Sequence, residues 1–90
     1  MYKIETSLKF RRDLKTASKR GYDIDKLNAV VELLVKNVTL PLKNRDHPLT
    51  GDYKGFRECH ITNDWLLIYR IEFNKLVLYL FRTGTHSDLF

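Results

Sequence analysis

The 90-residue sequence has one cysteine, two prolines, four glycines and no long apolar run. A single cysteine, Cys59, cannot form an internal disulfide, and we expect it to be a small buried hydrophobe in a strand of a cytoplasmic protein. The longest apolar stretches, residues 65–69 and 76–81, are far too short to span a bilayer. The first 20 residues carry seven basic side chains and no apolar stretch, so we expect no signal peptide.

The composition is that of a folded protein. Hydrophobic residues make up 43% of the chain and charged residues 30%, and the scarcity of glycine and proline argues against disorder. Ninety residues supply one modest core and leave no room for a second folded unit. We therefore expect a single domain over residues 1–90.

Basic charge is concentrated in the N-terminal half. Residues 1–45 hold 11 lysines and arginines against 5 acidic residues, whereas residues 46–90 hold 5 against 6. The N-terminal half is therefore a candidate surface for a polyanion. A helix face that is kept soluble by its charge explains the same pattern equally well.

A short strand and an amphipathic helix are expected first. Alternation predicts the strand over residues 2–5, and Thr6 or Ser7 can cap a helix over residues 8–20. Gly21 can adopt a positive φ and so end this helix. The apolar stripe of the helix consists of Leu8, Phe10, Leu14 and Ala17.

A second helix is expected over residues 24–37, capped by Asp23. Its core positions are Leu27, Val30, Val31, Leu34 and Val35. Residues 38–52 follow without a sustained period and contain both prolines and a histidine. Unstructured connections of this length are uncommon in compact domains and are often functional.

The remaining residues read as a three-stranded meander. Strands are expected over residues 53–61, 66–72 and 75–83, followed by an aperiodic tail at 84–90. The last two strands are apolar on both faces, as central strands are. The sequence therefore predicts an α+β fold, with an N-terminal strand, a two-helix hairpin and an antiparallel meander that form one twisted sheet.

All three histidines lie in the C-terminal half. His47 is in the loop, His60 is in the first meander strand and His86 is in the tail. Glu58 lies two residues before His60, so both side chains point to the same face of the strand, and Asp64 lies in the following turn. Because a meander brings strand ends together, these groups could meet His86 at one edge of the sheet.

This set of side chains suits metal-free cleavage of RNA. A base must remove the 2′-hydroxyl proton, an acid must protonate the departing 5′-oxygen, and a cation must stabilise the phosphate. Imidazole suits the first two roles because it titrates near working pH. Arg82 suits the third, since a guanidinium can grip two phosphate oxygens.

Each candidate also has a purely structural interpretation. His47 can be an exposed loop residue, and Asp64 can be a residue that favours a turn. His60 can form an ordinary side-chain pair with Glu58 on the strand, without a role in function. Likewise, His86 can be a disordered tail residue and Arg82 an exposed strand charge. Three histidines and a carboxylate can hold zinc, but the compact spacings of zinc motifs are missing, so we expect no metal and no other cofactor.

Four motifs resemble the YafQ branch of the RelE/ParE toxin superfamily, in the family's order and over essentially the whole chain. They are DHPL at 46–49, GDYKGFRECH at 51–60, DWLLIY at 64–69 and RTGTHSDLF at 82–90. The resemblance implies a βααβββ fold. It also implies a ribosome-dependent mRNA endonuclease of a type II toxin–antitoxin system, held inactive by an acidic antitoxin similar to DinJ.

Residue by residue, the resemblance places six side chains at family active-site positions. They are His47, Glu58, His60, Asp64, His86 and Phe90. Similar toxins use the tail histidine as general acid. We expect RNA to contact Phe90, Arg82, Lys54, Arg11, Arg12 and Lys15.

The chain departs from the YafQ pattern at two places. Glu58 stands where the pattern has aspartate, which moves the carboxylate one methylene further out and leaves its role open. Thr62 and Asn63 precede Asp64 where relatives often have a proline, which predicts a looser turn.

Two other functions stay open at this point. ParE-type toxins of the same superfamily poison DNA gyrase without cutting RNA, and fold alone does not decide between the two activities. The third possibility is a plain RNA-binding module. Neither alternative needs three histidines with Asp64, and this favours the nuclease.

Overall fold

Five strands form one mixed sheet in the computed structural model, which describes residues 1–90. The strands are β1 (Lys3–Thr6), β2 (His47–Pro48), β3 (Arg57–Thr62), β4 (Trp65–Glu72) and β5 (Val77–Gly84). Their order across the sheet is β1-β5-β4-β3-β2. β1 pairs with β5 in parallel and all other neighbours are antiparallel. The expected α+β fold is confirmed, and β4 and β5 are central as their apolar faces predicted.

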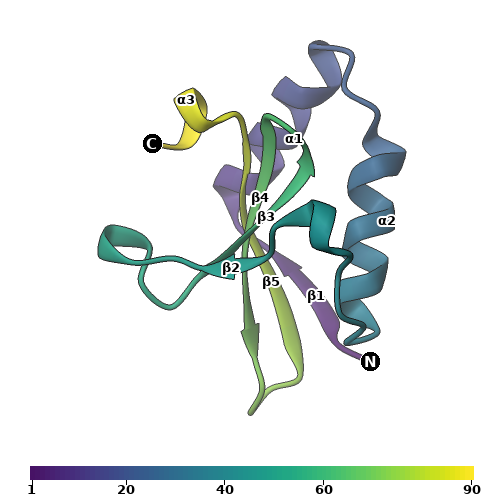
Figure 1. Cartoon of the computed structure of the whole chain (residues 1–90), viewed down its shortest axis with the longest axis vertical. Coiled ribbons are helices and arrows are strands. Elements are labelled where there is room, and N and C mark those ends of the chain that lie inside the picture. The colour runs from purple at the N-terminus through teal and green to yellow at the C-terminus, as the bar shows by residue number, and fades with distance from the viewer.

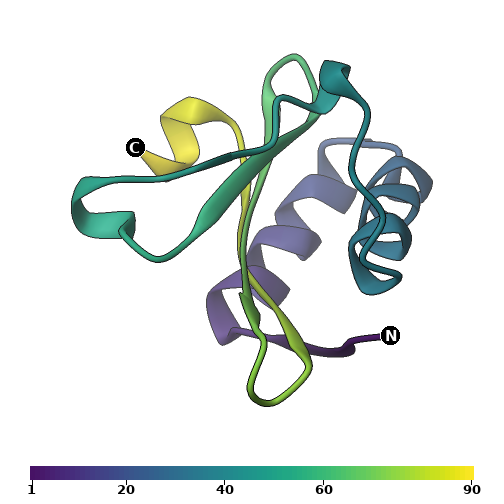
Figure 2. The same ribbon diagram turned by 60° about the horizontal axis from the view of Figure 1, so that its bottom comes forward.

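The helices are divided between the two faces of this sheet. They are α1 (Leu8–Lys19), α2 (Ile24–Val35) and α3 (His86–Leu89), with short 3-10 helices η1 (Leu42–Asn44) and η2 (Gly51–Tyr53). α1 and α2 cover one face, whereas α3 and η2 lie on the other (Figures 1 and 2). None of the helices is both long and apolar enough to cross a membrane.

Helix boundaries follow from the capping residues. Ser7 caps α1 by accepting a hydrogen bond from the Phe10 amide at 2.8 Å, and Gly21 ends the helix with φ 79°. Asp23 caps α2 as expected. This helix stops at Val35, earlier than predicted, because Asn37 takes the left-handed conformation that commonly terminates helices.

Two apolar clusters hold the layers together. The larger lies between the sheet and the two long helices and includes Phe10, Leu27 and Tyr69. The smaller lies on the opposite face, where Leu89 of α3 packs against Leu66 and Ile68 of β4. Three expected core positions were wrong in part: Leu8 is mostly exposed, and Leu14 and Val35 are only half-buried.

The sequence pattern missed four short elements, which are α3, β2, η1 and η2. The tail, expected to be aperiodic, contains α3, because Thr85 and Asp88 form a capping box. The expected loop contains β2, whose two residues form a strand only because they pair with β3. The first meander strand begins at Arg57 instead of residue 53, because η2 and a positive φ at Gly55 precede it.

Candidate active site

A buried carboxylate lies between two of the histidines. The register of β2 and β3 places His47 directly opposite Glu58, and the alternation of β3 puts His60 on the same face. The Nε2 atoms of His47 and His60 lie 3.5 and 3.8 Å from the same Glu58 oxygen, Oε1. Because the Glu58 side chain is only 5% exposed, its charge depends on these two imidazoles for compensation.

The other ring nitrogens of this pair determine where the protons are. Nδ1 of His47 lies 2.6 Å from the Arg45 carbonyl oxygen, and Nδ1 of His60 lies 3.3 Å from that of Asn63. A carbonyl only accepts, so both Nδ1 atoms carry the hydrogen. The Nε2 atoms, which face Glu58 Oε1, are therefore the nitrogens without hydrogen when these rings are neutral.

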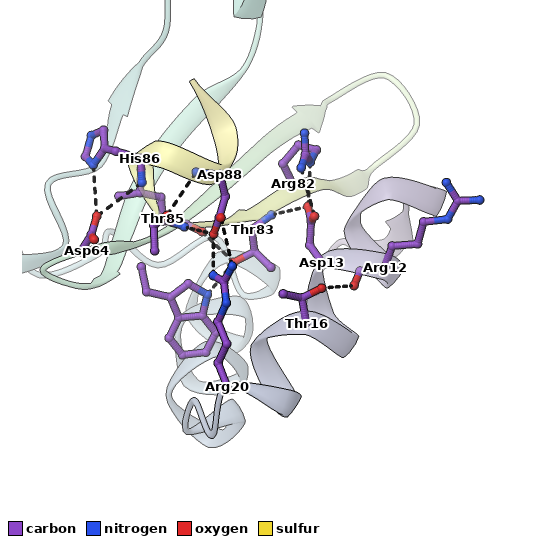
Figure 3. A network of polar contacts seen from close by, with 12 residues as sticks. Arg12, Asp13, Thr16, Arg20, Asp64, Arg82, Thr83, Thr85, His86 and Asp88 are labelled. Atoms are coloured by element: carbon purple, nitrogen blue, oxygen red, sulfur yellow. Dashed lines mark hydrogen bonds and ion pairs between the residues drawn. The ribbon is translucent and has the colours of Figure 1, made fainter.

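The third histidine joins these groups from the tail. His86 is the first residue of α3, and its ring centroid lies 6.0 Å from that of His60. Its Nδ1 lies 3.6 Å from Asp64 Oδ1, and its backbone amide donates to the same oxygen at 3.4 Å (Figure 3). The Phe90 ring lies 5.9 Å from the His86 ring. The structure thus brings together all five expected catalytic residues and Phe90.

Exposure differs sharply within this cluster. His60 and Glu58 form a buried centre, whereas the side chains of His47 and His86 are 46% and 57% exposed. Of the two exposed imidazoles, His47 contacts Glu58 and His86 lies beside His60. A phosphodiester bound over this centre could meet a proton acceptor on one side and a proton donor on the other.

Arg82 is paired with a carboxylate of α1. Its Nε and Nη2 donate to Asp13 at 2.7 and 3.1 Å, and the Thr83 amide donates to the same carboxylate at 3.1 Å (Figure 3). These hydrogen bonds raise the pKa of Arg82 and keep it cationic. Nη1 is the one Arg82 nitrogen that does not bond to Asp13, and it is the nitrogen left to bind a phosphate.

The other residues expected to contact RNA are spread over both faces. Arg11, Arg12 and Lys15 are exposed on α1, on the opposite side of the sheet from α3 (Figure 2). Lys54 is exposed directly after η2. The structure does not bring the basic side chains of α1 to the histidines.

The sequence reading missed several residues that hold the tail. The Tyr53 hydroxyl donates to the Leu89 carbonyl at 2.9 Å, and its ring meets Phe90 edge-on at 5.3 Å. Arg20 forms an ion pair with Asp88. The spacing of Thr85 and Asp88 is a capping-box signal that the sequence displays, whereas the contacts of Tyr53 and Arg20 join residues far apart in the chain and leave no local signal.

Two other kinds of site, a set of metal-ligating side chains and a reactive thiol, can be judged from the side chains near the histidines. No cluster of three or more histidine, cysteine, aspartate or glutamate side chains is placed to hold a metal ion. Cys59 is fully buried, as expected, and this burial raises the pKa of its thiol. The thiol is therefore protonated and does not act as a nucleophile.

The whole chain is similar to proteins of known class. Residues 2–90 match the family described as a bacterial toxin of type II toxin–antitoxin systems, YafQ. The mRNA interferase toxin YafQ of Escherichia coli K12 is 44% identical over 97% of this chain and 94% of its own length. The crystal structure of a metal-bound toxin from Helicobacter pylori is 48% identical, with a TM-score of 0.95 over 100% of both chains. In the E. coli DinJ–YafQ complex, a matching chain is 43% identical with a TM-score of 0.90, covering 100% of this chain and 99% of that chain. The chain belongs to the YafQ family of bacterial type II toxin–antitoxin toxins.

Proposed function

We propose that this toxin is an endoribonuclease that cuts mRNA by histidine acid–base catalysis without a metal. One observation carries the proposal: His47, Glu58, His60, His86 and Asp64 form one continuous chain of close contacts. The relative from E. coli K12 is named an mRNA interferase, and this supports the same substrate class.

The contacts divide the two proton transfers between the ends of the cluster. Asp64 faces Nδ1 of His86 and stabilises its protonated ring, while Nε2 stays free to protonate the departing 5′-oxygen. On the other side, the neutral ring of His60 or His47 has its hydrogen on Nδ1, so that Nε2 removes the 2′-hydroxyl proton and Glu58 beside it stabilises the imidazolium that forms. Each correctly placed group contributes about 10²–10⁴ in rate.

Binding groups surround this centre. Phe90 is 61% exposed beside His86 and offers a ring on which a base can stack. Lys54 and the free nitrogen of Arg82 supply positive charge for the phosphate. Glu58 serves as a positioning group in this scheme, because it contacts both imidazoles and is itself buried.

The basic face of α1 suits a second RNA contact, with the ribosome. Arg11, Arg12 and Lys15 lie on the face of the sheet opposite the histidines, so mRNA and ribosomal RNA can be held at the same time. Glutamine at all three positions should weaken cleavage of ribosome-bound mRNA and leave slow cleavage of free RNA unchanged. Equal cleavage of both substrates by wild type and variant would exclude ribosome dependence through this face.

An acidic antitoxin segment, helical in form, should cover the histidine edge and the basic helices. The uneven charge of the chain and the DinJ–YafQ complex of the E. coli relative support this proposal. Co-purification with an acidic protein encoded beside the toxin is the expected result. A lone toxin that a growing host tolerates freely would contradict it.

Expression without antitoxin tests the nuclease directly. Wild-type toxin should stop growth and degrade mRNA, and His86→Ala should do neither. Equal toxicity would remove His86 from the mechanism. DNA breaks with intact mRNA would indicate a gyrase poison instead, and unchanged function after alanine at all three histidines would indicate a plain RNA-binding module.

A further inference from the structure

The element that carries His86 is too short to be stable alone. α3 has four residues, and isolated helices of this length do not persist in water. Its position therefore depends on contacts with the rest of the protein. At the C-terminal end, Leu89 is buried against β4 and its carbonyl accepts the Tyr53 hydroxyl. These contacts hold the C-terminal end of α3 and do not involve His86 at its N-terminal end.

Besides the contacts of His86 with Asp64, the N-terminal end of α3 is held by Asp88 and the backbone it caps. Asp88 Oδ2 accepts a hydrogen bond from the Thr85 amide at 2.8 Å, and the Thr85 hydroxyl accepts one from the Asp88 amide at 3.2 Å. The carboxylate folds back over Gly84, where an added Cβ would lie 2.9 Å from Asp88. Gly84 therefore makes room for this cap.

Arg20 fixes the same carboxylate to the body of the molecule. Its Nη1 and Nη2 donate to the two Asp88 oxygens at 2.7 and 3.1 Å, a bidentate geometry (Figure 3). Hydrogen bonding from Arg20 lowers the pKa of Asp88 and keeps the carboxylate ionised. Arg20 caps the C-terminus of α1, and Asp13, two turns earlier on α1, grips Arg82 and Thr83. One helix thus holds β5 and α3 at two points.

We infer that Arg20 and Asp88 are positioning residues that hold the first turn of α3, and with it the His86 ring, in reach of the scissile phosphate. This inference rests on the proposed nuclease function. Without the pair, the cap of α3 loses its attachment to α1 and the first turn frays. Misplacing a catalytic group by about 1 Å can lower a rate on the order of 10²-fold.

Two substitutions separate this role from direct RNA binding by Arg20. Arg20→Met and Asp88→Asn should both lower kcat for mRNA cleavage by about tenfold or more, with KM nearly unchanged. Asparagine can still accept from the Thr85 amide, so Asp88→Asn removes mainly the ion pair. If Arg20 instead bound RNA directly, Asp88→Asn would free the Arg20 side chain and strengthen RNA binding, whereas Arg20→Met would weaken it. Such opposite effects of the two variants would overturn the inference.

Matched controls and a structural measurement complete the test. Lys36→Met removes an exposed ion pair on α2, and Asp25→Asn removes an exposed carboxylate there; both should match wild type. In Arg20→Met, NMR should show lost protection of the Asp88, Leu89 and Phe90 amides, which bond within the tail. Arg20→Lys keeps the positive charge but loses the bidentate hydrogen bonds to Asp88. Its kcat and its amide protection should therefore lie between those of wild type and Arg20→Met.

The two levels of the proposal can fail separately. Wild-type kcat and amide protection in Arg20→Met would overturn the positioning role, even where His86→Gln is inactive. Full activity of His86→Gln would overturn the nuclease mechanism and the positioning role that rests on it, whatever the amide exchange shows.

Discussion

The Asp13 carboxylate joins α1 to the strand that leads into the candidate site, and Asp13→Asn should destabilise the fold. This carboxylate accepts three hydrogen bonds, two from Arg82 at 2.7 and 3.1 Å and one from the Thr83 amide at 3.1 Å. Asparagine keeps one acceptor oxygen and turns an NH₂ group toward a donor. If the amide oxygen takes the place of Oδ2, Arg82 Nη2 loses its partner; in the other orientation, Arg82 Nε and the Thr83 amide both lose theirs.

The structure sets the size of this effect. A hydrogen bond to a charged group contributes about 1.5–3 kcal/mol, and an unsatisfied buried amide costs about 1–3 kcal/mol. The side chains of Asp13 and Arg82 are 16% and 21% exposed, so water replaces part of what is lost. We expect the free energy of unfolding to fall by about 2 kcal/mol, which lowers Tm by roughly 10 °C in a domain of this size.

Urea and thermal denaturation of the purified toxin measure this change. Asp25→Asn makes the same chemical change at an exposed position of α2 and should alter the free energy of unfolding by less than about 0.5 kcal/mol. A change in Asp13→Asn as small as that of the control would refute the reasoning, because it would mean that solvent fully replaces the Asp13 contacts.

Three further predictions concern chemistry and pH. Cleavage should persist in EDTA with a bell-shaped pH profile that belongs to the histidine cluster as a unit; loss of activity in EDTA or a flat profile would contradict acid–base catalysis by imidazole. Native Cys59 should resist iodoacetamide, because burial raises its pKa, and rapid labelling without unfolding would count against this. Since Arg20 lowers the pKa of Asp88 below the value of about 3.9 for a free aspartate, the clamp should persist from neutral pH down to about pH 4 and be lost as pH falls further. Constant heteronuclear NOE values for residues 86–89 over that range are expected, and fraying already at pH 5–6 would be the contrary result.

Local signals made much of the fold predictable. Ser7, Gly21 and Asp23 act at the helix boundaries as their residue types suggest, and the alternation in β3 places Glu58 and His60 on one face. These features depend on residues within a few positions of each other. The physical chemistry of capping and alternation therefore decides them without the rest of the chain.

Features that depend on contacts between residues far apart in the chain were not predicted from the sequence, or were predicted only in part. The two residues of β2 become a strand only by pairing with β3, and this pairing sets His47 opposite Glu58. Arg82 was expected to face a phosphate, but Asp13, which engages two of its nitrogens, lies 69 positions away. No local pattern announces such a pair, because either residue alone looks like an ordinary surface charge.

The most direct test of the proposed chemistry uses an mRNA with a single 2′-deoxy nucleotide at the cleavage site. Attack by the 2′-hydroxyl, with His86 protonating the leaving oxygen, predicts no cleavage at that position. It also predicts, for the unmodified message, one product with a 5′-hydroxyl and one with a 2′,3′-cyclic or 3′-phosphate. Cleavage of the deoxy substrate at the normal rate, or a product with a 5′-phosphate, would contradict the account.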